Sequence, residues 1–192
     1  MDSQTPQAPR VFQAIDRGER APYSPGEYAR RFVWSLVRLT IWRLPRMWSW
    51  RRFLLRAMGA KVGKGVLIHA SAHVYHPWLL EIGEYSVVGK DARIYNLGPV
   101  RIGSHTVISQ GAYVCAGTHD YTRPHLPLQR PPIVIDSGVW IAAAAFIGPG
   151  VTVGNNSVIG ARAVVMKDVP PGVVVGGNPA RVLKPREMRQ SS

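Results

Sequence analysis

A short stretch of the chain concentrates side chains that could carry acid–base chemistry. Residues 118–132 contain four prolines together with His119, Asp120, Tyr121, Arg123 and His125. A histidine side chain ordinarily titrates near ~6.5, so it can be neutral at pH 7 and accept a proton from a hydroxyl group. The stretch therefore has the residue types that general-base catalysis needs, provided that a rigid scaffold projects it.

An internal repeat on both sides of this stretch indicates what the scaffold is. Ile or Val recurs every six residues from Ile135 to Val165, and the spacing continues back to Val62 with eight-residue steps before Ile82 and Ile102. A period of six fits neither a helix nor a simple alternating strand, so each unit must be a short strand and a corner. The fifteen positions are Val62, Ile68, Val74, Ile82, Val88, Ile94, Ile102, Ile108, Val114, Ile135, Ile141, Ile147, Val153, Ile159 and Val165.

Three units make one triangular coil, and the repeat predicts an all-β core. Four residues after each branched residue the side chain is usually small, with Trp78 as the large exception. The step from Val114 to Ile135 is twenty-one residues instead of six, so fifteen residues leave the coil there as a loop. We therefore expect a parallel β-helix of about five coils over residues 61–175, with a loop at 118–132.

Composition indicates anionic partners and a reducing compartment. The 192 residues carry a net charge of +13, of which residues 1–61 contribute twelve basic and four acidic side chains. Such a charge suits phosphorylated ligands, anionic lipid or nucleic acid. The single cysteine, Cys115, excludes an internal disulfide. No signal-peptide pattern is visible, so we expect a cytoplasmic protein.

The N-terminal third differs from the repeat. Residues 1–23 read as a mobile arm, and residues 24–60 as a basic, aromatic helical extension. Ser24, Pro25 and Glu27 form a helix start, with Pro45 ending that helix after Leu44. A second helix is predicted from Arg46 to Met58, with Gly59 as its C-cap. Residues 176–192 read as a basic tail.

The helical extension has several possible roles. Tryptophan, phenylalanine and arginine alternate along it, and Arg38 would lie in the middle of any membrane span, which argues against one. Its apolar faces could cap the open end of the coils or contact a neighbouring subunit. Residues 25–58 could instead lie on an anionic membrane surface. Nucleic acid binding is the least favoured of these roles.

Several motifs carry a resemblance to a known family. They are WRRFLLRAMGAKVGKGV, YNLGPVRIGSH, CAGTHDY, DSGVWIAAAAFIGPGVTVG and KDVPPGVVVGGNPARVLK. The chain resembles the hexapeptide-repeat acyltransferases over residues 30–185, and among them the sugar O-acetyltransferases of colanic-acid and other exopolysaccharide biosynthesis. The resemblance implies a left-handed β-helix, a homotrimer, and acetyl-CoA in the groove between subunits. It also implies a sugar or lipid-linked saccharide as acceptor.

The resemblance further assigns roles to individual residues. His119 matches the motif histidine of the family and would be the general base. In the acetyl-CoA site, Ala143 and Ala161 would face the pantetheine arm through backbone groups, and Trp140 could shape the groove. Met166 stands where threonine is common. The phosphates would meet Lys167, Arg181 and Lys184.

Two further residues are candidates for the acceptor side. Ile94 and Val114 are twenty residues apart, so Asn96 stacks beside Ala116, near the start of the loop. Asn96 could bind the acceptor, as a comparable asparagine does in the resembled galactoside and maltose enzymes, or it could satisfy a corner of the coil. Asp120 could orient His119 or point elsewhere.

The same scaffold is compatible with other functions. A metal site of the γ-carbonic-anhydrase kind needs three histidines, and Gln110 stands where a partner of His69 and His105 is required. We therefore expect no metal. A catalytically silent binding module, or an acetyltransferase with an antibiotic hydroxyl as acceptor, stays open. Cys115 reads as coil packing, because nothing nearby activates it as a nucleophile.

Overall fold

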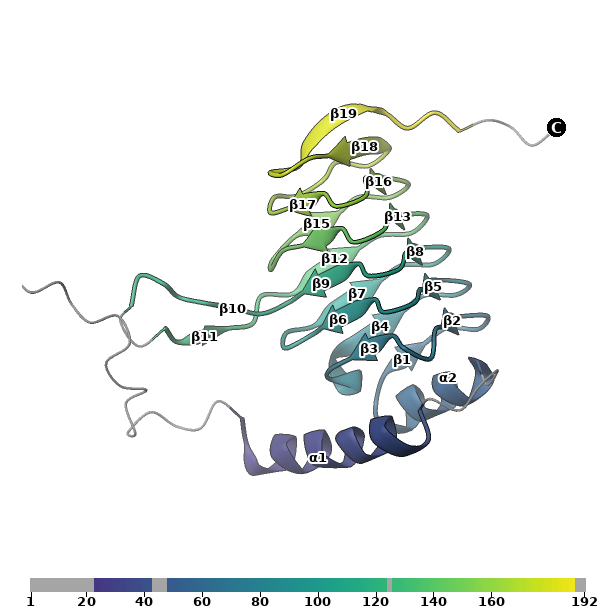
Figure 1. Cartoon of the computed structure of the whole chain (residues 1–192), viewed down its shortest axis with the longest axis vertical. Coiled ribbons are helices and arrows are strands. Elements are labelled where there is room, and N and C mark those ends of the chain that lie inside the picture. The colour runs from purple at the N-terminus through teal and green to yellow at the C-terminus, as the bar shows by residue number, and fades with distance from the viewer. Residues whose placement is uncertain (1–22, 43–47, 124–125, 189–192) are drawn as a thin grey trace, which may run out of the picture.

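The main body is a three-sided solenoid of short strands (Figure 1), seen in a computed structural model that describes residues 23–42, 48–123 and 126–188. Its strands form three sheets, one on each side. The first sheet contains β1 (Lys61–Val62), β4 (Leu80–Ile82), β7 (Val100–Ile102), β12 (Ile133–Ile135) and β15 (Thr152–Val153). The second contains β2 (Leu67–Ile68), β5 (Val87–Val88), β8 (Val107–Ile108), β13 (Trp140–Ile141), β16 (Val158–Ile159), β18 (Val173–Gly176) and β19 (Arg181–Pro185). The third contains β3 (His73–Val74), β6 (Arg93–Tyr95), β9 (Tyr113–Cys115), β14 (Phe146–Ile147) and β17 (Val164–Val165).

The strand register confirms the predicted coil lengths. Leu67 pairs with Val87, twenty residues on, whereas Trp140 pairs with Val158, eighteen residues on. Across the inserted segment, Val107 pairs with Trp140, and the separation of 33 exceeds 18 by the expected 15. One eight-residue step contains a short 3-10 helix, η1 (Pro77–Leu79). The result is a left-handed parallel β-helix of five complete coils and part of a sixth.

The core consists of the predicted branched side chains. All fifteen are at most 8% exposed, and most are fully buried. Glycine follows Ile82 and Ile102 because the next coil leaves no room for a side chain. A Cβ on Gly83 would lie 2.5 Å from the nitrogen of Ser104, and one on Gly103 would lie 2.5 Å from that of Ser137.

Two helices precede the solenoid. α1 (Pro25–Thr40) starts with the predicted capping box between Ser24 and Glu27. It ends earlier than predicted because Trp42 turns into the core and is 2% exposed. The predicted helix end rested on Leu44 and Pro45, which lie outside the described residues. The N-terminal segment 1–23, predicted to be a mobile arm, also lies outside them except for Tyr23.

The second helix has the predicted C-cap. α2 (Trp48–Ala57) starts after Arg46, which also lies outside the described residues. Gly59 has a φ of +93°, and the nitrogen of Ala60 donates to the carbonyl of Leu55 at 2.9 Å. Glycine adopts this left-handed conformation without strain, so it ends the helix where the sequence predicted.

The helices cap the N-terminal end of the solenoid, one of the roles considered from the sequence. Leu54 and Leu55 join the hydrophobic core. Carbonyl groups in and beside the first two strands accept hydrogen bonds from arginines of α2. Arg51 donates to Ile68, Arg52 to Val66 and Arg56 to Val62, at 2.7, 2.9 and 2.9 Å respectively. Three of the basic side chains in the extension are therefore structural.

The other end is closed by a strand rather than left as a tail. Lys184 and Arg181 lie in β19, which pairs antiparallel with β18. The guanidinium of Arg186 donates to the carbonyl of Gly138 at 2.7 Å. Within the basic tail expected from residue 176, residues 181–185 form a strand whose backbone pairing with β18 extends the second sheet.

Candidate active site

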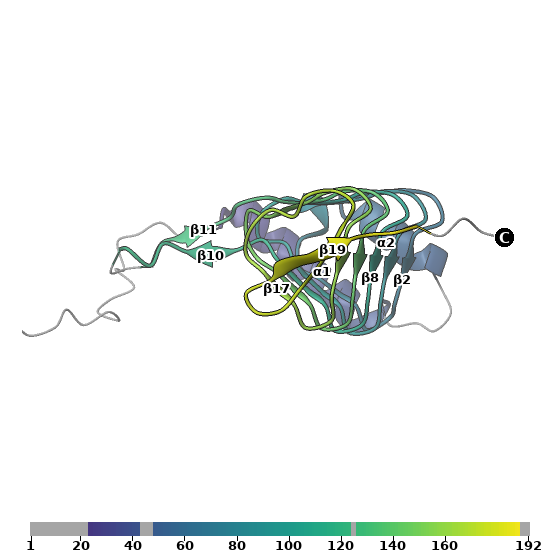
Figure 2. The same cartoon turned by 90° about the horizontal axis from the view of Figure 1, so that it is seen from above.

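The segment that carries His119 is a hairpin arm, not an irregular loop. It leaves the corner between the third and first sheets and projects sideways from the solenoid (Figures 1 and 2). β10 (Thr118–His119) and β11 (Leu128–Gln129) pair antiparallel, with His119 opposite Leu128. This backbone pairing, which the repeat pattern does not reveal, fixes where the histidine lies.

A main-chain carbonyl holds the ring of His119. The Nδ1 atom lies 2.5 Å from the carbonyl oxygen of Leu126, and Leu126 has a φ of +48°. The backbone nitrogen of Leu126 donates to the carbonyl of Arg123 at 3.0 Å, and this hydrogen bond fixes the position of Leu126 in the arm. A carbonyl can only accept a hydrogen bond, so in the neutral ring Nδ1 carries the proton and Nε2 is free to accept one.

Asp120 shapes the turn that places Leu126. Its carboxylate accepts hydrogen bonds from the nitrogen of Thr122 at 3.0 Å and from the Thr122 hydroxyl. It also pairs with Arg123 at 3.2 Å. The carboxylate thus acts on the tip of the arm, and the Leu126 carbonyl contacts the His119 ring.

Asn96 stacks as predicted, but its amide faces the other way. Tyr95 pairs with Cys115, which places Asn96 beside Ala116. The amide oxygen accepts from the backbone nitrogens of Tyr75 and His76 at 3.2 and 3.0 Å. Because Asn96 is 0% exposed, the expectation that it contacts the acceptor is not met within this chain. It satisfies a corner of the coil, the alternative reading.

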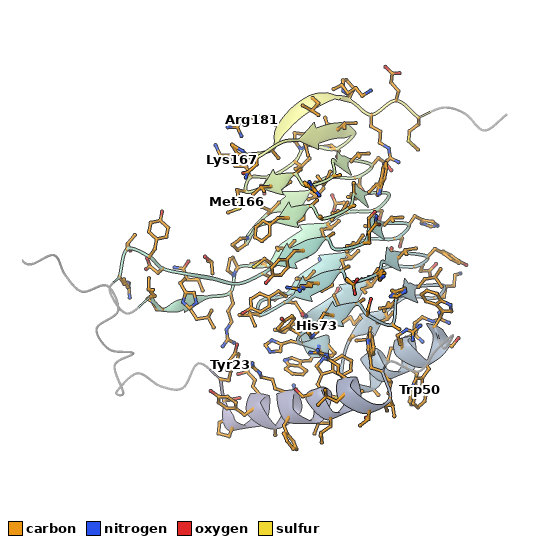
Figure 3. All side chains as sticks on the ribbon, viewed as in Figure 1. Tyr23, Trp50, His73, Met166, Lys167 and Arg181 are labelled. Carbon is orange, nitrogen blue, oxygen red and sulfur yellow. The ribbon has the colours of Figure 1, made fainter. Side chains whose placement is uncertain are left out.

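The residues expected to bind the donor fall into two groups. Lys167 and Met166 follow β17 at the same edge as the arm, two coils farther along. With Arg181 they line a cavity of about 250 Å³ at the C-terminal end of the solenoid (Figure 3). This group could meet an anionic ligand through two cationic side chains.

The second group lies on another edge of the prism. Ala143 and Ala161 are stacked at the corner between the second and third sheets, where the nitrogen of Arg162 donates to the Ala143 carbonyl. Trp140 lies on the second sheet and is 48% exposed, with its indole nitrogen donating to Ser109 at 3.0 Å. Lys184 is exposed on β19. A single chain therefore does not bring these residues together with His119.

A contact that the sequence did not suggest ties the arm to the helical extension. Arg130 follows β11 at the base of the arm and pairs with Glu27 of α1 at 3.5 Å. The guanidinium of Arg130 also lies 4.6 Å from the ring centroid of Tyr23. We call Tyr23, Glu27 and Arg130 the arm latch.

A buried histidine lies beneath the arm latch. His76 is 1% exposed, stacks on Trp78 with ring centroids 4.9 Å apart, and touches the Tyr23 ring edge-on. Burial, together with the charges of Arg31 and Arg130, lowers the pKa of His76 to about 4, against a smaller opposing effect of Glu27. The side chain is therefore neutral at pH 7 and packs as an aromatic ring.

An aromatic row covers the outer face of the third sheet. Tyr75, Tyr95, Tyr113 and Phe146 contact one another edge-on, with centroids 4.6, 6.1 and 5.6 Å apart. Burial raises the pKa of Tyr113 to about 12 and also raises the pKa of the neighbouring Cys115 thiol. Because a thiolate is the reactive form, this environment does not activate Cys115.

The described residues show neither a metal-binding cluster nor a membrane-spanning helix. Among the described positions, no three His, Cys, Asp or Glu side chains gather closely enough to hold a metal ion. Neither helix of the described part combines the length and apolar character that crossing a bilayer requires.

Comparison with known proteins gives consistent matches. Residues 132–167 match the family model described as bacterial transferase hexapeptide (six repeats). The chain is 45% identical over 156 residues to WcaF of Escherichia coli (strain K12), which bears the name of a colanic acid biosynthesis acetyltransferase; the match covers 80% of this chain and 86% of that protein. It is 32% identical over 137 residues to the galactoside O-acetyltransferase of the same strain, covering 70% and 68%.

A solved structure matches over nearly the whole chain. It is a hexapeptide-repeat acetyltransferase from Vibrio cholerae complexed with acetyl-CoA, with a TM-score of 0.80 and 28% identity, covering 88% of this chain and 94% of that one.

Proposed function

Because the chain belongs to the hexapeptide-repeat acetyltransferases, we propose that it transfers an acetyl group from acetyl-CoA to a hydroxyl group of a saccharide. The observation that carries this proposal for the chain's own residues is the arm histidine, whose Nδ1 is held by a carbonyl. The other ring nitrogen of His119, Nε2, can then accept a proton from an alcohol.

His119 would act as general base in a single displacement. Nε2 takes the proton of the acceptor hydroxyl while the oxygen forms a bond to the thioester carbonyl carbon. The carbon–sulfur bond then breaks, and the departing thiolate takes the proton from Nε2, which restores the neutral ring. Proton transfer of this kind typically contributes ~10²–10⁴ in rate.

The C-terminal end offers groups that fit the donor. Lys167 and Arg181 border the cavity there, and Lys184 is exposed on the neighbouring strand. Ammonium and guanidinium groups bind the phosphates of coenzyme A as charge partners. Met166, 54% exposed at the same edge, would contribute apolar contact where a hydroxyl is absent.

A homotrimer would complete the site. Ala143 and Ala161 lie on a different edge from His119, so the pantetheine arm can meet both groups only if a second copy supplies one of them. A closed cyclic assembly repeats the same heterologous interface around the axis. Each groove would then combine the arm of one subunit with the alanine corner of its neighbour.

Mixing two inactive variants tests this arrangement. His119→Ala removes the base, and Ala161→Trp blocks the corner of the neighbouring subunit. Co-expressed together, they should regain on the order of one quarter of wild-type activity, because random trimers contain grooves with both halves intact. If a stable mixed trimer regained no activity, His119 and the alanine corner of one site would have to come from the same subunit.

The acceptor would be a saccharide unit used in polysaccharide assembly, free or attached to a lipid. The similarity to WcaF supports this class, and the basic helices fit an enzyme of the cytoplasm with peripheral contact to the inner face of the membrane. Incubation with acetyl-CoA and a panel of soluble oligosaccharides should release free thiol together with an acetylated sugar. Thiol release without an acetylated product from any of these sugars would count against a saccharide acceptor.

A further inference from the structure

The outward side of α1 is apolar and uncharged. α1 lies across the N-terminal end of the solenoid (Figure 1). Its inward side carries Trp34, which is buried and donates to the carbonyl of Val74 at 2.8 Å. A surface helix normally presents charged and polar side chains on the opposite side. In α1 the exposed Ser35 and Thr40 turn their hydroxyl groups back to the carbonyls of Arg31 and Leu36. Four large side chains at helical spacing point outward, with exposed fractions of 46%, 66%, 47% and 80%: Tyr28, Phe32, Leu36 and Leu39.

We call these four residues the outer stripe, and α2 extends the apolar surface at the same end. Phe53 is 56% exposed and stacks on Trp50, with ring centroids 5.4 Å apart. Figure 3 shows Trp50 at the same end of the molecule as α1. Large exposed apolar side chains gathered at one end of a molecule mark an interaction site rather than ordinary solvent-facing protein.

Charge identifies the partner. Residues 24–60 carry eight arginines and one acidic residue, a net charge of 8 − 1 = +7. Arg51, Arg52 and Arg56 donate to carbonyl groups of the first coil, and the guanidinium of Arg30 lies 6.0 Å from the ring centroid of Trp78. These partners are neutral, so they do not cancel the positive charge of the extension. A second copy would bring the same positive charge face to face, whereas anionic lipid headgroups would neutralise it.

We propose that the outer stripe of α1 docks on an anionic lipid bilayer. Phenylalanine and leucine would enter the boundary between headgroups and acyl chains, while the net positive charge of the extension attracts the anionic headgroups. In the trimer of the proposed function, on which this step rests, a threefold axis along the solenoids would place three stripes at one end. Three simultaneous contacts bind far more tightly than one.

The arm latch connects this surface to the active site. Glu27 lies in the first turn of α1 and pairs with Arg130 at the base of the arm. Tyr23 lies beneath the arm at the start of the same helix (Figure 3). Docking through α1 would therefore hold the arm beside the bilayer. This placement favours an acceptor saccharide that is carried on a membrane lipid.

Flotation of the purified full-length protein with vesicles tests the proposal. Wild-type protein should float with vesicles that contain phosphatidylglycerol and stay unbound with phosphatidylcholine alone. The variant Phe32→Glu/Leu36→Glu/Leu39→Glu should lose at least about tenfold in vesicle affinity, because three carboxylates oppose both burial and the anionic surface. Its melting temperature should stay at the wild-type value, since all three side chains are exposed.

A matched control carries the same type of change at the other end of the molecule. Met188→Glu, at an exposed position beyond β19, should float like wild type. Equal flotation of the stripe variant and wild type would overturn the proposal. So would stripe-dependent association of trimers without lipid, which would identify a second copy as the partner. Acetyl transfer to a water-soluble sugar is measured on the same samples. Loss of this activity would count against the proposed function, whereas loss of flotation alone would concern only the membrane proposal.

Discussion

The Nδ1 atom of His119 lies 2.5 Å from the main-chain carbonyl oxygen of Leu126. This contact ties the chemistry of the site to a backbone conformation, because Leu126 has a positive φ of +48°. Residues other than glycine adopt this region infrequently. Among the described residues, six corners of the solenoid also contain a non-glycine residue with a φ of 54–57°, whereas Leu126 lies in the arm. The tautomer of the proposed base thus depends on a turn at the tip of the arm.

Changing Leu126 should therefore alter catalysis without altering donor binding. Leu126→Val places a β-branched side chain at a positive φ, which should shift the carbonyl and lower kcat roughly ten- to a hundredfold. The KM for acetyl-CoA should stay unchanged. Leu126→Asn, which tolerates the left-handed conformation, should keep most of the activity. Wild-type kcat in Leu126→Val would show that the carbonyl does not position His119.

The arm latch should restrain the arm from its base. In a double-mutant cycle, Glu27→Gln and Arg130→Gln should show a coupling energy of about 0.5–1 kcal/mol, as expected for a partly exposed ion pair. Amide exchange at Asp120, whose nitrogen donates to Pro127, should become faster in either variant. Glu81→Gln breaks the ion pair with Lys61, far from the arm, and serves as the control. Additive effects and unchanged exchange would remove the latch from this account.

Arg51 should be the most important residue of the N-terminal cap. Its guanidinium is 2% exposed and donates to the Ile68 carbonyl at 2.7 Å, and burial lowers the pKa of this group. Arg51→Met keeps much of the packing but leaves a buried carbonyl without its donor, so the free energy of unfolding should fall by about 2–3 kcal/mol. Arg93→Met, at an exposed position on β6, should change it little. Equal losses in a denaturant titration would contradict a capping role.

His76 should make the protein sensitive to mild acid. Its pKa of about 4 in the folded state lies below the ordinary value of 6.5, so the unfolded chain binds a proton first as the pH falls. The stabilisation is present above pH ~6.5 and is lost between that pH and about 4, by roughly 3 kcal/mol.

The variant His76→Phe separates the titration of His76 from that of the other groups that lower stability in acid. Arg31, Arg130 and Glu27 also face the ring, and all three stay in His76→Phe. That variant keeps an aromatic ring against Trp78 but cannot take up the proton. Its unfolding free energy should therefore fall less than that of wild type between pH 7 and pH 4.5. Parallel curves for the two proteins would show that His76 does not titrate as described.

The repeat in the sequence predicted the solenoid because burial acts at regular positions. Each Ile or Val of the pattern lies under the next coil, and the inserted fifteen residues marked the corner from which the arm leaves. The capping box at Ser24 and the glycine at position 59 were also predictable, since both are local signals.

Features that depend on contacts between distant segments were not predictable. The register placed Asn96 beside Ala116, but a side chain can turn toward either neighbouring coil, and the amide turned toward His76. The role of Arg51 depends on carbonyls left open at the end of a sheet, and the arm latch joins residues 103 positions apart. Spacing along one chain contains no signal for such pairs.

Replacing His119 by Ala is the most direct test of the account. With acetyl-CoA as donor and a soluble sugar that wild type acetylates, kcat should fall by ~10²–10⁴, while the KM for acetyl-CoA and the melting temperature stay close to wild type. Acetyl transfer at the wild-type rate by folded His119→Ala protein would contradict the assignment of the arm histidine as the base.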